Sequence, residues 1–313
     1  MSELTGEVNN QFKFLKGFIG AFRLMHFLPV ITTTTIGMVV TLITLKGDLS
    51  FSELLSNLVS GAIPFVPVIF LTLTLFFQQA FCGIQNDYID REIDSFYDKR
   101  KTITDGWVTP EFAFWWGITC FILFTGFSIG VGFWAEIGFW SILYVQGANL
   151  IGIFYNLYAK HKPISIIPYM IGFPLIPIYV WTTFGGFRIE HLWIIPLLIL
   201  VSFPAHIANE IPDYEMDLKY NKKNFAVFLG KKVATIIYWI GILLIEVEIL
   251  VVYLLYNFNT WIFVSVVTLS LSVGIITFII LWKRKWHTDL LIFNLVTGCI
   301  GIEIIGFFTM FSL

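Results

Sequence analysis

Charged residues are scarce in this sequence. Only 13% of its 313 residues are Asp, Glu, Lys or Arg, whereas soluble domains average about 25%. Hydrophobic residues make up 57% of the chain, and the mean hydropathy is +0.82. Because a soluble protein must cover its surface with polar groups, this composition excludes an ordinary soluble domain. It predicts an integral membrane protein whose solvent is the lipid bilayer.

Cysteine is also sparse, and the net charge is close to zero. The three cysteines, Cys82, Cys120 and Cys299, lie far apart inside apolar runs. Their spacing excludes a zinc-binding motif and a disulfide framework. A net charge of −2 offers no general attraction to nucleic acid, so no nucleic-acid partner is expected. The first sixteen residues lack an apolar run before a small-residue cleavage site, so no cleavable signal peptide is expected.

Long apolar runs dominate the rest of the chain. A helix that spans a bilayer needs about 20 mostly apolar residues, and the sequence contains nine such segments. We therefore expect an all-α integral membrane protein, with nine transmembrane helices in a bundle that forms a single domain over residues 1–313. The predicted spans are 20–45, 62–86, 110–133, 135–157, 164–184, 190–211, 233–256, 260–282 and 289–312.

The positions of the basic residues predict the orientation of these spans. If the N-terminus lies inside, 17 of the 19 Lys and Arg residues fall on the inner side, and only Lys46 and Arg188 fall outside. This asymmetry is the one that the positive-inside rule requires, and it predicts a multi-pass protein of the cell membrane. Residues 9–22 are amphipathic and basic, which suits either an interfacial segment within 1–19 or an ordinary helix start.

One internal repeat carries the chemistry. Residues 86–94 read NDYIDREID, and residues 209–217 read NEIPDYEMD. Both fit N-[D/E]-x-x-D-x-E-x-D, and we call them the first and the second motif. Each motif closes an even-numbered span, the second and the sixth, so both emerge on the inner side. The repeat suggests two related helical halves of about four spans each, with a ninth helix added.

Three polar residues in each motif are spaced at i, i+4 and i+8. On a helix this spacing places them in one stripe within about 80°, although Pro212 is expected to distort the second stripe locally. If the stripes face each other, four carboxylates and two amides converge. The residues are Asn86, Asp90 and Asp94 in the first motif, and Asn209, Asp213 and Asp217 in the second.

Such a cluster of oxygen ligands needs compensating cations. Each Asp at a helix centre in lipid costs about 2.5–3.5 kcal/mol, and oxygen-only ligands favour a hard ion such as Mg²⁺. Mg²⁺ is usually shared between one or two carboxylates and substrate phosphates. A phosphorylated ligand with an apolar tail, such as an isoprenoid diphosphate, meets both demands. The alternative is that the motifs are solvated helix ends. The remaining motif acids are expected to be solvated or supporting groups: Asp87, Glu92, Glu210 and Glu215.

The two motifs resemble the paired aspartate-rich motifs of the UbiA superfamily of membrane prenyltransferases. AFRLMHFLPV, SFYDKRKTITDGWVT, YNLYAKHKP and DYEMDLKYNKKNFAVFLGKK are similar to further conserved segments of that family. The chain departs from the family pattern at Thr102, where Pro is usual, at Asn221, where Gly is usual, and at Asn224, where Thr is usual. Whether Lys160 or Lys162 matches the family's lysine stays open.

The resemblance implies a mechanism. Two Mg²⁺ ions would bridge the motifs and the donor diphosphate, with inner cap loops at 87–109 and 212–232 folded over the site on the cytoplasmic side. Loss of pyrophosphate would give an allylic carbocation that alkylates an acceptor. The catalytic residues implied are Asp90, Asp94, Asp213 and Asp217, which with Asn86 and Asn209 would also hold the metal. The diphosphate-binding residues implied are Arg23, Lys101, Tyr155, Lys160 and Lys222.

Several functions remain compatible with the sequence. The second motif and the segment KKNFAVFLG after it resemble the quinone-precursor branch of the family, and this resemblance implies an aromatic or quinone-precursor acceptor. Geranylgeranyl transfer to a glycerol phosphate ether, as in archaeal lipid synthesis, is the alternative, with haem or chlorophyll prenylation a third. A cation-coupled secondary transporter is the competing class, because it also combines an internal repeat with buried acids. His206, one turn before Asn209, could line the cavity or act in polar packing.

Overall fold

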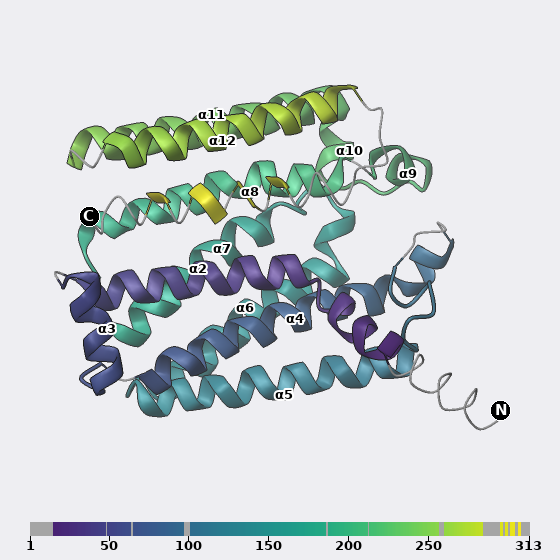
Figure 1. Cartoon of the computed structure of the whole chain (residues 1–313). Helices are drawn as coiled ribbons and strands as arrows, with labels where there is room; N and C mark the ends of the chain where they lie inside the picture. The colour runs from purple at the N-terminus through teal and green to yellow at the C-terminus, as the bar shows by residue number, and fades with distance from the viewer. Residues whose placement is uncertain are drawn as a thin grey trace, which may run out of the picture.

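The protein is a bundle of α-helices in the computed structural model (Figure 1). The structure describes residues 15–47, 49–63, 65–96, 101–185, 187–211, 213–256 and 260–283, and positions 295–296, 298–299, 301–303 and 306–307. No strand occurs in these ranges. The long helices are α2 (Phe27–Lys46), α4 (Phe65–Phe96), α5 (Pro110–Trp134), α6 (Phe139–Leu157), α7 (Ile167–Phe184), α8 (Ile194–Glu210), α11 (Lys231–Tyr256) and α12 (Thr260–Lys283).

The expected all-helical membrane fold is confirmed. Seven helices of the described chain are long and apolar enough to cross a bilayer. Eight of the nine predicted spans coincide with the long helices, since α6 also falls on a predicted span. Most of the ninth span, 289–312, lies outside the described residues, so the count of nine and the orientation stay predictions.

The long helices pack as neighbours around a continuous apolar core. The α4 helix contacts α2, α5 and α6, while α8 contacts α7 and α11, and α12 packs against α11. Figure 1 shows α11 and α12 along one side of the bundle and α5 along the opposite side. Fully buried side chains such as Leu71, Phe124 and Leu197 fill the interior. The two motif-bearing helices, α4 and α8, therefore stand on different sides of a shared core.

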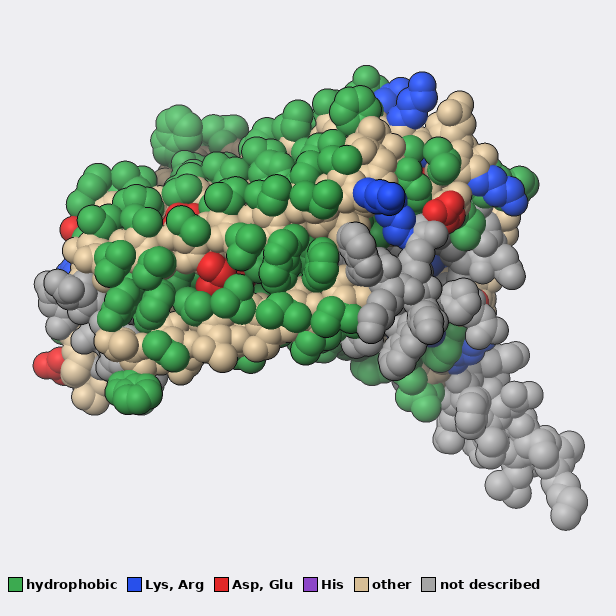
Figure 2. Space-filling model, turned by 90° about the horizontal axis from the view of Figure 1, so that it is seen from above, with side chains coloured by type: hydrophobic (Ala, Val, Ile, Leu, Met, Phe, Trp, Pro, Cys, Tyr) green, Lys and Arg blue, Asp and Glu red, His purple; other side chains and the backbone are tan. Residues whose placement is uncertain are grey.

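The outer surface suits a bilayer. Hydrophobic side chains cover the bundle along its length in Figure 2, and Lys and Arg side chains gather at one end. That end carries the short helices α9 (Tyr214–Lys219) and α10 (Phe225–Leu229) in Figure 1. We call it the inner end. The opposite end carries α3 (Phe51–Ser60), whose first turn is closed by a capping box between Ser50 and Glu53.

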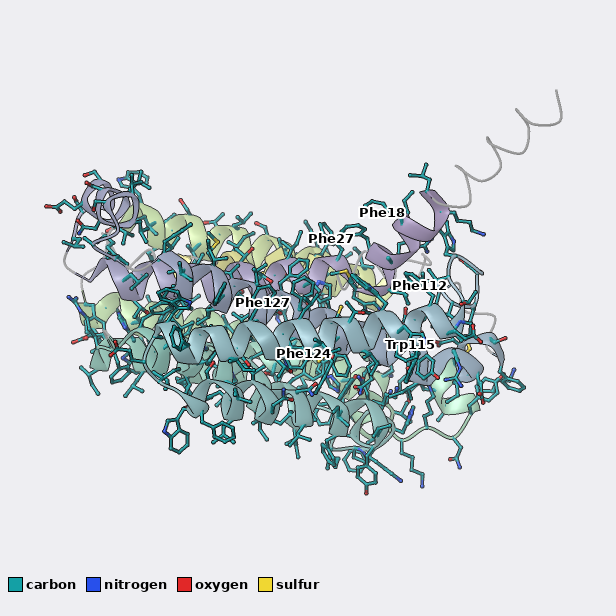
Figure 3. The ribbon with its side chains drawn as sticks, turned by 90° about the horizontal axis from the view of Figure 1, so that it is seen from below. Phe18, Phe27, Phe112, Trp115, Phe124 and Phe127 are labelled. Atoms are coloured by element: carbon teal, nitrogen blue, oxygen red, sulfur yellow. The ribbon has the colours of Figure 1, made fainter. Side chains whose placement is uncertain are left out.

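An N-terminal helical segment, residues 15–24, docks at the inner end. The guanidinium of Arg23 lies 4.5 Å from the ring centroid of Trp107, and the ammonium of Lys16 lies 5.7 Å from it. Gly20 makes this docking possible, because a Cβ there would fall 2.7 Å from Cγ1 of Val108. Figure 3 shows Phe18 of this segment at the same end of the bundle as Phe112 at the start of α5. Residues 1–14 of the predicted interfacial segment lie outside the described part.

The two motifs sit on unlike backbones. The first motif belongs entirely to α4, whose 32 residues run to Phe96. The predicted cap loop 87–109 therefore starts as helix, and its described part at 101–109 is a turn. The second stripe was expected on one helix, and that expectation is wrong. The α8 helix ends at Glu210, and Asp213 is the N-cap residue of α9. Proline at 212 accounts for the break, because it has no N–H with which to continue the helical hydrogen bonds.

Candidate active site

The first motif points its stripe at partners from three other segments. Nδ2 of Asn86 donates to Oδ1 of Asn156 on α6, at 3.0 Å. Oδ1 of Asp90 lies 2.5 Å from Nζ of Lys160, in the short 3₁₀ helix Ala159–His161. Oδ2 of Asp94, which is buried, lies 2.9 Å from Nζ of Lys101. The stripe therefore gathers cationic and amide groups from distant parts of the chain.

Lys101 joins two acids of α4. Its Nζ lies 3.0 Å from Oδ1 of Asp87 as well as 2.9 Å from Oδ2 of Asp94. Burial by itself would lower the pKa of Lys101, but the carboxylates of Asp87, Asp94 and Asp90 outweigh it and raise that pKa above its ordinary value. The ammonium is thus a permanent positive charge beside the first motif.

The second motif is organised around Asp217. Its Oδ1 lies 3.0 Å from Nζ of Lys222, and its Oδ2 accepts a hydrogen bond from Nδ2 of Asn224 at 2.8 Å. Asn224 also caps α10, where its Oδ1 accepts from the backbone N–H of Val227. Asp217 and Asn224 are both buried, whereas Asp213 is half-buried and Asn209 is exposed.

The two motifs approach each other at the inner end. The ring of Phe96, two residues beyond Asp94, meets the ring of Tyr220 edge-on, with centroids 5.4 Å apart. Lys160 is subject to the charges of Asp90 and Lys101 beside the first motif and of Lys222 beside the second. Burial, followed by the repulsion from Lys101 and Lys222, lowers the pKa of Lys160 despite the attraction of Asp90.

Lys101, Lys160 and Lys222 form what we call the lysine trio. Each member makes an ion pair with a motif aspartate: Asp94, Asp90 and Asp217 respectively. The trio is positive and faces acids from both motifs, so it can hold either the carboxylates or the oxygens of a polyanionic ligand. The structure also distinguishes Lys160 from Lys162, whose ammonium lies over the ring of Tyr158 at 5.7 Å and whose side chain is exposed.

Two other predicted diphosphate-binding residues have different surroundings. Arg23 stacks on Trp107 in the 101–109 turn, as described above. Tyr155 packs edge-on against Tyr169, with ring centroids 5.3 Å apart, and against His206, at 6.2 Å. Both residues contact aromatic side chains in this structure.

Two acids that sequence reasoning set aside are parts of the site's framework. Asp87 is 3% exposed and pairs with His26 and Lys101. Glu210 is 5% exposed; its Oε1 accepts from Oγ of Ser165 at 2.7 Å, and its Oε2 accepts from the backbone N–H of Ala226 at 2.8 Å. The repeat could have identified both acids, because an acid directly follows the Asn in each motif.

The residue at 221, which departs from the family pattern, shapes the turn after the second motif. Asn221, in place of a usual Gly, has φ of 57°, and Asn is among the residues that best tolerate this left-handed conformation. Gly106, which aligns with a family glycine, has φ of 64°. The backbone N–H of Lys222 then returns to the carbonyl of Asp217, at 2.9 Å. The turn at Asn221 therefore brings Lys222 back onto the second motif.

The donor set fits Mg²⁺. In the described residues no three His, Cys, Asp or Glu side chains converge on one metal position. Mg²⁺ does not require such convergence, because it is usually bound by one or two carboxylates, with waters and phosphate oxygens completing six ligands. Asp90 and Asp94 on one side, and Asp213 and Asp217 on the other, supply oxygen ligands of this kind.

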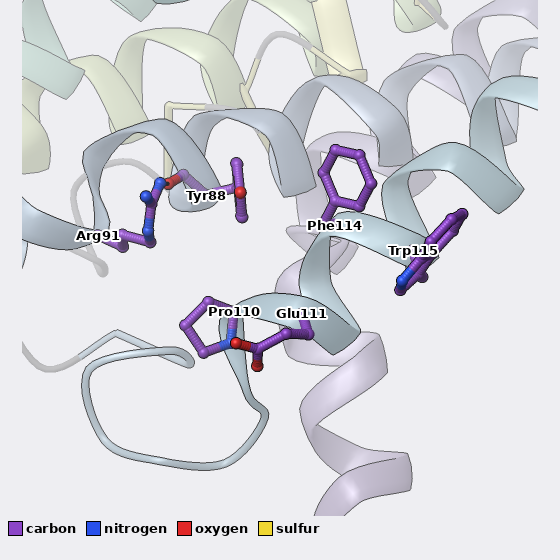
Figure 4. A pocket seen from close by; sticks show the side chains of 6 residues that line it. All are labelled: Tyr88, Arg91, Pro110, Glu111, Phe114 and Trp115. Carbon is purple, nitrogen blue, oxygen red and sulfur yellow. Dashed lines mark hydrogen bonds between the residues drawn. The ribbon is translucent and has the colours of Figure 1, made fainter.

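A separate cleft of about 460 Å³ opens on the outer face of α4 and α5 (Figure 4). Tyr88 and Arg91 line it from α4, and Pro110, Glu111, Phe114 and Trp115 line it from α5. Oxygen ligands of the predicted stripes do not contribute to this lining. The candidate site is therefore the region between the motifs and not this cleft.

A family model described as the UbiA prenyltransferase family matches residues 55–297. The chain belongs to this family. The match spans both motifs and every member of the lysine trio, and the resemblance found in the sequence is confirmed. The protein is thus a membrane prenyltransferase by family.

Curated relatives with a similar sequence are named digeranylgeranylglyceryl phosphate synthase. The one from Methanobrevibacter smithii is 26% identical over 67% of this chain and 75% of its own length. The one from Pyrococcus horikoshii is 28% identical over 56% of this chain and 62% of its own length.

Solved structures share the fold. A UbiA homologue from Archaeoglobus fulgidus, bound to GPP and Mg²⁺, has a TM-score of 0.63 at 18% identity, over 94% of this chain and 99% of that one. A UbiA homologue from Aeropyrum pernix K1 in its apo form has a TM-score of 0.65 at 14% identity, over 88% and 96%. A structure from a study of digeranylgeranylglyceryl phosphate synthase in membranes has a TM-score of 0.62 at 16% identity, over 95% and 99%.

Proposed function

We propose that the protein transfers a geranylgeranyl group from its diphosphate to the free hydroxyl of a glycerol phosphate ether, in a reaction that depends on Mg²⁺. The observation that carries the transferase chemistry is the lysine trio set against two aspartate motifs. The similar curated relatives favour this acceptor over the aromatic or quinone precursor that the sequence alone favoured. The aromatic acceptor is kept as the second candidate, because of the segment after the second motif.

The charge balance of the site supports a diphosphate donor. In the structure Lys101, Lys160 and Lys222 neutralise the motif aspartates. When a metal-bound diphosphate occupies the site, the aspartates would hold the metal and the three ammonium groups would turn to the diphosphate oxygens. Positive charge held in place where the leaving group becomes more negative lowers the barrier to C–O cleavage. Bound Mg²⁺ supplies Lewis-acid stabilisation of the same leaving group.

The chain's own residues also position the reaction. Asn156 holds Asn86, and Asn224 holds Asp217, so each motif is oriented by an amide from outside it. The 101–109 turn and the α9–α10 segment lie at the inner end, where they would cover the site and keep water from the carbocation. We place this site on the cytoplasmic side, from the distribution of basic residues.

A panel of acceptors tests the proposal. The purified protein in nanodiscs would receive geranylgeranyl diphosphate, Mg²⁺ and one acceptor at a time, and both pyrophosphate and prenylated product would be measured. Product with geranylgeranylglyceryl phosphate alone supports the proposal, whereas product only with 4-hydroxybenzoate or a naphthoate favours the aromatic acceptor. If no acceptor gives product and the protein carries cations into liposomes, the proposed enzymatic function is wrong and the protein is a transporter.

A further inference from the structure

The acid that follows the Asn in each motif holds a histidine. Oδ1 of Asp87 lies 3.0 Å from Nε2 of His26, and Oε1 of Glu210 lies 2.9 Å from Nε2 of His206. The two pairs thus repeat a relationship that the motif spacing alone does not show. His206 comes from the same helix as its partner, whereas His26 comes from the junction between the N-terminal segment and α2.

The two histidines differ in what can reach them. His206 is fully buried; its Nε2 is 2.8 Å from Oγ of Ser165, and its ring packs against Tyr169 with centroids 4.6 Å apart. A substrate could not contact it, so its role is polar packing that anchors α8. The side chain of His26 is 36% exposed, while the carboxylate that holds it is buried. Only the pair in the first half is therefore open to a ligand.

The backbone around His26 is built to place this ring. His26 has φ of 53° and ψ of 64°, a left-handed conformation that is strained in a residue other than glycine. Gly83, one helical turn before Asp87, makes room for it, since a Cβ there would lie 3.2 Å from Cβ of His26 and 3.1 Å from the carbonyl oxygen of Met25. The α4 helix thus supplies a gap at Gly83 and an anchor at Asp87.

The anchor connects His26 to the first motif. Lys101 shares Oδ1 of Asp87 with His26 and reaches Oδ2 of Asp94 with the same ammonium. The charged groups that face the ring are therefore the carboxylate of Asp87 from α4 and the ammonium of Lys101 from the 101–109 turn. Arg23, on the segment before His26, is held over Trp107. Nε2 of His26 lies 3.0 Å from Oδ1 of Asp87, so Nδ1 is the ring nitrogen that this carboxylate does not engage.

We propose that His26 is the catalytic base that takes the proton of the acceptor hydroxyl, with Asp87 as its positioning residue. The inference rests on the proposed transferase function. In the step, the hydroxyl oxygen forms a bond to C1 of the prenyl group, whose bond to the diphosphate oxygen has broken. The electron pair of that bond leaves with pyrophosphate, and the hydroxyl proton passes to Nδ1 of His26 and then to water.

The substitution His26→Gln distinguishes a catalytic role of His26 as a base from a structural role as a partner of Asp87. The amide keeps an N–H that can donate to Asp87, but it cannot accept a proton from the acceptor. Binding of a non-hydrolysable geranylgeranyl thiodiphosphate with Mg²⁺ should stay within about twofold of the parent protein. Product formation should fall about 100-fold or more, the range expected for loss of a general base. Pyrophosphate released without product should rise relative to product, because water captures the cation.

The pH dependence of product formation should change if His26 is a base, but not if its role is only structural. In the parent protein, product formation should decline toward acidic pH, because a protonated imidazole cannot accept the hydroxyl proton. That decline should be absent in His26→Gln. His206→Gln is the matched control: it should lower the thermal midpoint but keep the parental pH profile.

The outcomes are distinct. If the parent protein prenylates no hydroxyl acceptor, the proposed function fails and His26 has no such role. If the parent protein is active and His26→Gln equals it in rate and pH profile, the base assignment is wrong while the proposed function stands. If His26→Gln loses binding of the donor analogue in proportion to its activity, the ring serves to hold Asp87 and Lys101, and the base assignment is also overturned.

Discussion

The ammonium of Lys160 lies 2.5 Å from Oδ1 of Asp90, and the two residues come from opposite sides of a 70-residue stretch of sequence. Removing this ammonium should cripple diphosphate departure while the aspartate remains. Lys160→Met is expected to lower the rate of pyrophosphate release about 100-fold or more, by analogy with loss of a fixed charge in other active sites. Lys162→Met, which changes a side chain over Tyr158, should retain the parental rate. Equal losses in the two variants would contradict the role given to Lys160.

The motif aspartates should be indispensable for turnover but not for folding. Asp90→Ala and Asp213→Ala are each expected to abolish product formation, because each removes an oxygen ligand that Mg²⁺ requires in a site with few protein ligands. Thermal melts in detergent would show that the helical bundle persists. Glu92→Ala is the matched control on the same helix, since its side chain is 83% exposed. Parental activity in either aspartate variant would refute the role of that residue.

Removal of divalent metal should stop the reaction reversibly. EDTA is expected to reduce product formation to background, and excess Mg²⁺ should restore it. The lysine trio suggests a further result: the metal-free protein should remain folded, because the ammonium groups already neutralise Asp90, Asp94 and Asp217. An undiminished rate in EDTA would remove the metal from the mechanism.

The docking of the N-terminal segment can be tested at a glycine. Gly20→Ala places a methyl group 2.7 Å from Cγ1 of Val108, whereas Gly17→Ala meets no atom within 4 Å. Overpacking of this kind costs about 1–3 kcal/mol. Gly20→Ala should therefore expose the 101–109 turn to limited proteolysis and reduce activity, and Gly17→Ala should do neither. Identical proteolysis patterns would show that this contact does not hold the turn.

The turn that returns Lys222 to Asp217 depends on a left-handed residue. Asn221→Gly should preserve or slightly raise the thermal midpoint, because glycine adopts φ of 57° without strain. Asn221→Val should lower stability by about 1–2 kcal/mol, the usual cost of this conformation for an L-residue with a Cβ. Lys223→Val, at the exposed position nearby, is the control. A valine at 221 that leaves the midpoint unchanged would contradict this account of the turn.

Features of the fold that depend on a single repeating pattern along the chain could be predicted from the sequence. Apolar length alone located the long helices, and the i, i+4, i+8 spacing placed Asn86, Asp90 and Asp94 along one helix. Prediction from the sequence failed where the backbone changes direction. The second stripe is divided between α8 and α9, and Pro212 was expected to cause only a local distortion. A proline in a membrane helix can kink it or end it, and sequence alone does not choose between these results.

Contacts between residues that are far apart in the sequence could not be predicted either. Asp87 was set aside because it lies off the stripe, yet it is almost fully buried and joins His26 to Lys101. The choice between Lys160 and Lys162 also depended on the path of a short 3₁₀ helix that apolar periodicity does not describe. Both outcomes depend on tertiary packing, which places groups from separate segments side by side.

The two motifs fix the spacing of their acids in different ways. Asn86, Asp90 and Asp94 are locked into a single ladder of helical hydrogen bonds, so their span of about 12 Å along the axis cannot change without melting α4. Asp213 and Asp217 ride on a six-residue helix that is separated from Asn209 by a break. The position of Asp217 is therefore set by its own contacts with Lys222 and Asn224, and no continuous helix carries it along with Asn209.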